Sequence, residues 1–167
     1  MTDYTSFRPS KLWRRLPVER RTEAATLFWS DEQSIDQQME AVGAIASRMK
    51  FRPRSVADLP IEKKARYLAT LPTVSDTIAA RALINYHLER QRPMMVAFLD
   101  SLGITHENGL ISDEAVSKPD EGKLERAAAA LATKFPPDDV SLYFATLVSQ
   151  DPDTWGALAE LPQTSAR

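Results

Sequence analysis

Prolines divide this chain into segments whose apolar residues recur with helical spacing. Most of the 11 prolines stand just before such a segment. A proline costs little there, because the first backbone N–H groups of a helix have no partner inside the helix. Alternation typical of strands is almost absent, so the pattern predicts an all-α protein with about seven or eight helices. The expected helices are 17–29, 31 or 34 to 50, 60–71, 75–92, 93–103, 119–135, 137–150 and 152–161.

The length of 167 residues fits a single helical domain over 1–167 that buries its own core. We expect tails at 1–9 and 162–167, and a mobile linker at 112–121, where acidic residues mix with serine and proline. The dipeptide Asn108-Gly109 is typical of a two-residue turn, so at most a small hairpin is expected near 104–111.

One segment, 76–92, is apolar around most of its circumference. Its polar residues form a single stripe, made of Arg81, Asn85, Glu89 and Arg92. This pattern is typical of a central helix surrounded by its neighbours. Other helices show one apolar face, which we expect to be buried; in the 31–50 segment that face is Ile35, Met39, Val42, Ile45 or Ala46, and Met49.

Charge is distributed unevenly. Residues 1–92 carry 16 basic and 11 acidic side chains, and residues 93–167 carry 5 and 12. Much of the basic excess lies in two clusters. The first surrounds Trp13 and consists of Lys11, Arg14, Arg15, Arg20 and Arg21. The second consists of Arg48, Lys50, Arg52 and Arg54. Clustered arginines attract anions, so these residues are a candidate partner surface. Helix-end charges on solvated faces are the simpler interpretation.

The two histidines offer one alternative site. On a helical wheel His87 lies opposite the polar stripe, which predicts a buried, neutral imidazole in the core. A buried polar pocket formed with Tyr86 is the alternative interpretation.

Motifs of familiar enzymes are missing. The sequence contains no nucleophile elbow, no phosphate-binding glycine loop and no zinc-protease motif. It has no cysteine and only two histidines, so we expect neither a catalytic activity nor a metal or other cofactor.

The first residues lack the apolar run of a signal peptide, and no segment is apolar enough to span a bilayer. We therefore expect a cytoplasmic protein without membrane contact. The hypothesis that best fits the sequence is a non-catalytic interaction or adaptor subunit with a protein partner or a homo-oligomeric state. The alternatives are a ligand-binding protein or enzyme with a pocket at Tyr86 and His87, and nucleic-acid binding through the basic clusters. The acidic second half makes nucleic acid the weaker partner.

Overall fold

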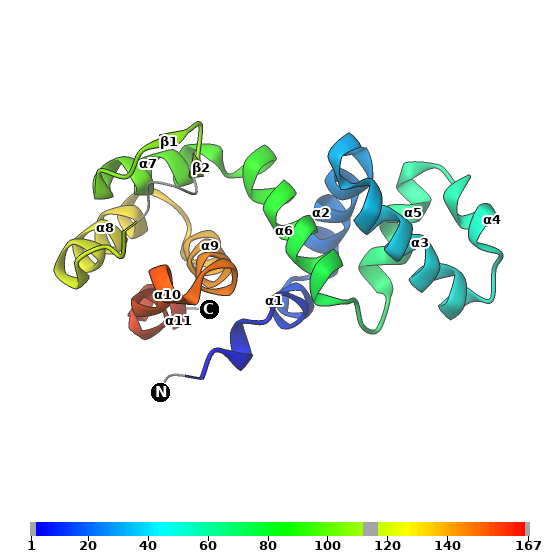
Figure 1. Ribbon diagram of the computed structural model, residues 1–167, viewed down its shortest axis with the longest axis horizontal. Coiled ribbons are helices and arrows are strands. Elements are labelled where there is room, and N and C mark those ends of the chain that lie inside the picture. The colour runs from blue at the N-terminus through cyan, green and yellow to red at the C-terminus, as the bar shows by residue number, and fades with distance from the viewer. Residues whose placement is uncertain (1–2, 112–116, 166–167) are drawn as a thin grey trace. The chain divides into compact units, whose positions relative to one another are not determined.

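The computed structural model describes residues 3–111 and 117–165 and confirms the all-α prediction (Figure 1). Helices account for 78% of the described residues, in eleven α-helices and three short 3₁₀ helices, with one two-stranded sheet. Each of the eight expected helices is present. The additional α-helices are short ones of four to seven residues.

In chain order the elements are η1 (Thr5–Phe7), α1 (Pro9–Arg15), α2 (Val18–Ser30), η2 (Glu32–Ser34), α3 (Ile35–Met49), α4 (Pro53–Ala57), α5 (Ile61–Thr70), α6 (Asp76–Arg90), α7 (Arg92–Leu102), β1 (His106–Glu107), β2 (Leu110–Ile111), α8 (Glu121–Lys134), α9 (Pro137–Gln150), α10 (Pro152–Trp155), η3 (Gly156–Glu160) and α11 (Pro162–Ser165).

The expected single domain consists of two compact units. Residues 8–89 form one unit, and the described residues of 1–7 and 90–167 form the other. We call them the 8–89 unit and the 90–167 unit. The boundary falls at the end of α6, where Gln91 leaves the helical conformation with φ −125° and ψ 19° before α7 begins.

In the 8–89 unit, α2 packs along α5. Small residues make this close approach possible: Ala24 and Ala25 on α2, and Ala65 and Ala69 on α5, are all fully buried. Phe28 adds a large apolar side chain with no exposed surface. Burial of such side chains is worth roughly 1.5–3 kcal/mol each, so this pair of helices contributes much of the core of the unit.

The predicted central helix of this unit is α6. Its buried residues lie on several sides and include Ile78, Ala82 and Tyr86. The first turn is fixed in two ways. Ser75 accepts a hydrogen bond from the backbone N–H of Ile78, and Asp76 accepts hydrogen bonds from Arg8 and from the N–H of Ser10 on α1.

The 90–167 unit is built around α9, which contacts α8, α10, η3, α11 and η1. The centre of this unit is aromatic. Phe98 on α7 lies 5.7 Å from Tyr143, 4.9 Å from Phe144 and 6.0 Å from Trp155, measured between ring centroids. All four side chains are buried. The buried face of α9 thus supplies much of the core of this unit.

The segments expected as tails include the helical elements η1 and α11. The helix η1 packs on α9. The hydroxyl of Tyr4 lies where a Cβ at Gly156 would stand, so this close approach requires glycine. At the other end Thr164 on α11 is buried, and its carbonyl accepts a hydrogen bond of 2.8 Å from the Ser141 hydroxyl. Both segments expected as tails thus contain residues that pack on α9.

The small hairpin forms as expected. Strands β1 and β2 are antiparallel, and His106 pairs with Ile111. Asn108 and Gly109 both adopt positive φ angles, 51° and 91°, as a type I′ turn requires. Of the expected mobile linker 112–121, residues 112–116 lie outside the described part of the chain; α8 already begins at Glu121.

Candidate interaction surface

The first basic cluster lies on α1 and α2. Three of its cations, Lys11, Arg14 and Arg15, are exposed on α1, whereas Arg20 and Arg21 on α2 are half-buried. Trp13 is only 3% exposed. The tryptophan expected on a partner surface therefore belongs to the core, and the exposed part of this cluster consists of the three α1 cations.

The second basic cluster follows the end of α3 and the start of α4. Arg48, Lys50, Arg52 and Arg54 are all exposed. Lys50 adopts the left-handed conformation, with φ 58°, and ends α3. Within the 8–89 unit, α1 and α4 lie at opposite ends (Figure 1), so the two clusters do not form one continuous basic face.

The alternative site at Tyr86 and His87 is part of the core. Both side chains are 3% exposed, and their rings meet edge to face at 5.5 Å. The Nδ1 atom of His87 lies 2.8 Å from the carbonyl oxygen of Leu83, one turn earlier in α6. Because a carbonyl oxygen only accepts, Nδ1 carries the proton in this contact. The burial agrees with the helical-wheel prediction.

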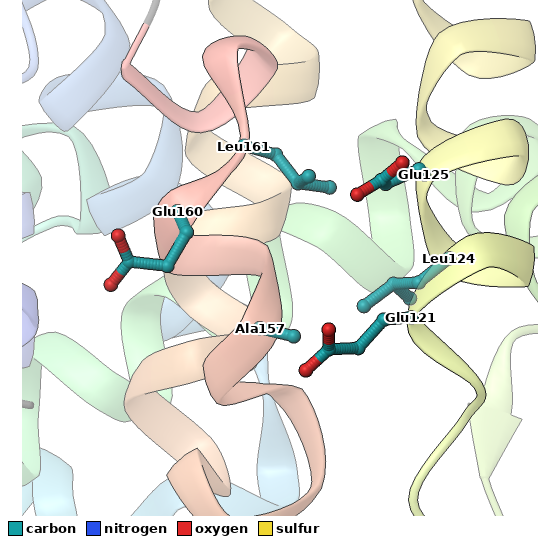
Figure 2. Close-up of a pocket in the computed structure, with 6 residues that line it drawn as sticks. All are labelled: Glu121, Leu124, Glu125, Ala157, Glu160 and Leu161. Atoms are coloured by element: carbon teal, nitrogen blue, oxygen red, sulfur yellow. The ribbon is translucent and has the colours of Figure 1, made fainter.

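A recess of about 160 Å³ opens in the 90–167 unit between α8 and the η3–α11 segment (Figure 2). Glu121 and Glu125 extend from α8 toward Ala157 and Leu161, whereas the carboxylate of Glu160 turns away from α8. All three glutamates are exposed. Among the residues that the structure describes, no three His, Asp or Glu side chains are placed to hold a metal ion together. The recess is therefore an open surface feature lined in part by exposed carboxylates.

A polar network fixes the start of α3. The hydroxyl of Ser34 is fully buried and donates to the carboxylate of Asp31. The same hydroxyl oxygen accepts hydrogen bonds from Arg81 Nε at 2.8 Å and from Asn85 Nδ2 at 3.2 Å. Arg81 also pairs with Asp31. The polar stripe of α6 is thus partly buried, because Arg81 and Asn85 bind the segment before α3.

Electrostatics favour the charged form of Asp31 in this network. Partial burial by itself raises the pKa of the carboxyl group. The hydrogen bonds from Ser34 and from the backbone N–H of Gln33, together with the charge of Arg81, outweigh that effect and hold the pKa below its ordinary value of 3.8.

A second anchor determines which face of α3 is buried. Gln38 donates from Nε2 to the carbonyl oxygens of Phe28, at 2.9 Å, and Asp31, at 2.8 Å, near the end of α2. Ala41 and Ile45 follow on the same face and have no exposed surface. The buried face of α3 is therefore the series 34, 38, 41 and 45.

The apolar face predicted from the sequence shares Ile45 with this series, but its other members lie on the neighbouring side of the helix, and Ala46 among them is also buried. We call its members Ile35, Met39, Val42 and Met49 the α3 strip. Each residue advances an α-helix by about 100°, so this series is rotated away from the buried one. Ile35 is 59% exposed, Met39 70% and Met49 39%. The expectation of burial was wrong for Ile35, Met39 and Met49, but Ile45 and Ala46 of the predicted face are buried. Hydrogen bonds of Ser34 and Gln38 turn a more polar face inward.

Gly43 lies beside the strip, in the middle of α3. A Cβ atom added at this position would meet nothing within 4 Å. Glycine in a helix interior costs roughly 0.5–1 kcal/mol relative to alanine. Among the described residues, neither backbone conformation nor packing requires glycine at this position.

The charges beside the strip differ between its two ends. The N-terminal half of α3 and the residues before it carry exposed Glu32, Asp36 and Glu40. The C-terminal end carries the second basic cluster. Phe51, 41% exposed, continues the apolar surface between those cations.

Searches against protein-family models, curated proteins and solved structures found no match to this chain. The described helices include none with the length and apolarity to cross a membrane. The α3 strip therefore stands on its own geometry. One sequence signal for it existed: Ile35, Met39, Val42, Ala46 and Met49 follow the 3.5-residue period of helices that pair with other helices, although Ala46 is buried and does not belong to the strip.

Proposed function

We propose that this chain is a helical protein-interaction subunit that binds its partner through the α3 strip. The observation that supports this most strongly is the exposure of Ile35 and Met39, at 59% and 70%. Single exposed apolar residues are common on protein surfaces. A row of them on one helix face, spaced for helix pairing, is typical of a surface that another protein covers.

Methionine strengthens this proposal. Met39 and Met49 are unbranched and flexible, and such side chains adapt to the shape of a partner. The fold holds the strip in place, because Gln38 and Ser34 fix the adjacent side of α3 by hydrogen bonds. A helix that is already formed loses little backbone freedom on binding.

Site-specific photo-cross-linking tests the proposal. A photoreactive phenylalanine analogue replaces Met39 in one variant and Arg66, an exposed residue of α5, in a control variant. Irradiation in cells should give a discrete protein adduct from position 39 and none from position 66. Equal adducts from both positions, or none from position 39, would contradict the proposed function.

A further inference from the structure

Resting on the proposed function, we propose that the partner on the α3 strip is a second copy of this chain, bound through the same strip with the two α3 helices antiparallel. The inference draws on three properties of α3: the position of its charges, the position of Gly43 and the spacing of its apolar residues.

The charges of α3 complement those of an antiparallel copy. Asp36 lies seven residues before Gly43, and Lys50 lies seven residues after it. Two-fold symmetry about an axis near Gly43 brings Asp36 of each copy toward Lys50 of the other, which gives two equivalent pairs of opposite charges. A parallel pair would instead oppose like charges at both ends. The surrounding charges agree, with Glu32 at the acidic end and Arg52 at the basic end.

The position of Gly43 fits the same axis. Two helices approach most closely where they cross, and a residue without a side chain lets the backbones come near. In the single chain, the space beside Gly43 is open. In the antiparallel pair, that space receives the other copy's α3, which gives this glycine a role that its own chain does not.

The apolar residues pair in the same register. Val42 lies near the axis and meets its own equivalent, while Ile35 meets the end of the strip at Met49 and Phe51. These three outer residues are 59%, 39% and 41% exposed. The pairing covers all of them. A pair of 15-residue helices makes a small interface, so we expect a dissociation constant on the order of 10 µM.

Sedimentation velocity over about 2–200 µM protein tests the inference through charge exchange. Wild type should pass from monomer to dimer. Asp36→Lys and Lys50→Asp should each weaken the dimer about tenfold or more, because each brings like charges together at both ends. The double variant should recover the affinity of the wild type. Aspartate suits position 50 because it tolerates positive φ.

Controls separate folding from pairing. Circular dichroism and thermal melts check that each variant keeps its helices. Gly43→Leu should abolish the dimer while its melting temperature, measured at a concentration where wild type is monomeric, does not fall, since the added side chain has free space in the monomer. Double-variant affinity no better than that of the single variants would overturn the antiparallel pairing.

The two proposals fail differently. If the wild type stays monomeric to 200 µM and position 39 forms a photo-adduct with a different protein, the partner is not a second copy of this chain. The proposed function then still holds. A monomer without any adduct from position 39 contradicts both.

Discussion

The guanidinium group of Arg81 meets the carboxylate of Asp31 at 3.3 Å, and the hydroxyl of Ser34 contacts both. This contact joins α6 to the segment that starts α3. It determines the rotation of α3 about its own axis, because Ser34 immediately precedes the first helical residue. The rotation in turn decides that Ile35 and Met39 face solvent.

Replacing Ser34 therefore destabilises the 8–89 unit. Ser34→Ala removes the acceptor of Arg81 Nε and Asn85 Nδ2. We expect a loss of about 1–3 kcal/mol in the free energy of unfolding, the usual consequence of a buried polar group without a partner. Urea denaturation measures it. Ser47→Ala, at an exposed position of the same helix, should change stability by less than about 0.5 kcal/mol. Equal effects of the two substitutions would contradict the role of Ser34.

Acid should weaken the fold through two carboxylates. Hydrogen bonds from the Ser10 side chain, and from Arg8 and the Ser10 backbone, lower the pKa of Asp76 below its ordinary value of 3.8, and the pKa of Asp31 is lowered as well. A carboxyl whose pKa is lower in the folded state stabilises the fold above its unfolded-state pKa. That stability is lost as pH falls through the folded-state value.

We therefore expect the melting temperature to fall as pH decreases below about 4. Asp76→Asn should melt lower than wild type at pH 7 and should lose less on acidification, since one of the two titrating carboxyls is gone. If the melting temperatures of the two proteins fell by the same amount between pH 7 and 2.5, Asp76 would not contribute to the acid sensitivity.

His87 should prove structural. His87→Ala removes a buried ring and its contact with the Leu83 carbonyl. The expected cost is about 1–3 kcal/mol in unfolding free energy. Glu89→Ala, at an exposed position of α6, serves as the control. An unfolding curve equal to that of wild type, combined with loss of binding to a ligand, would favour the pocket at Tyr86 and His87 instead.

The sequence predicted the helices well because their signals are local. Proline before an apolar-periodic segment marks the starts of α5 and α9, and Gly103 with φ 70° ends α7. The Asn108-Gly109 turn is equally local. Such signals depend on a few neighbouring residues, so no knowledge of tertiary packing is needed to use them.

The buried face of α3 could not be predicted in the same way. Hydropathy favours Ile35 and Met39 over Ser34 and Gln38, but the second pair is satisfied by groups about 10 to 50 residues away, including Phe28 and Asn85. Trp13 illustrates the same difficulty on α1. Its arginine neighbours suggested a partner surface, yet the ring is buried, because amphipathic spacing places Leu12 and Trp13 in the core.

Nucleic acid should not bind this chain at physiological salt. Helix α1, which carries the exposed cations of the first cluster, and helix α4, which adjoins the second, lie at opposite ends of the 8–89 unit (Figure 1). A phosphate backbone is bound well only where cations form a continuous face. Fluorescence anisotropy with labelled single-stranded and duplex DNA at about 150 mM salt should show no saturable binding. Micromolar binding that disappears in Arg14→Glu/Arg15→Glu would contradict this expectation.

Disulfide trapping at Gly43 tests the antiparallel α3 pair most directly. The chain has no cysteine, so one introduced cysteine reports on one position. Gly43→Cys lies near the two-fold axis and should form a disulfide-linked dimer readily under mild oxidation. Ser47→Cys, one turn further along α3, places the two cysteines about 12 Å apart along the helix axes, too far for a disulfide bond. We predict fast, nearly complete trapping at position 43 and little at position 47. Equal trapping at both positions, or none at position 43, would contradict the pairing.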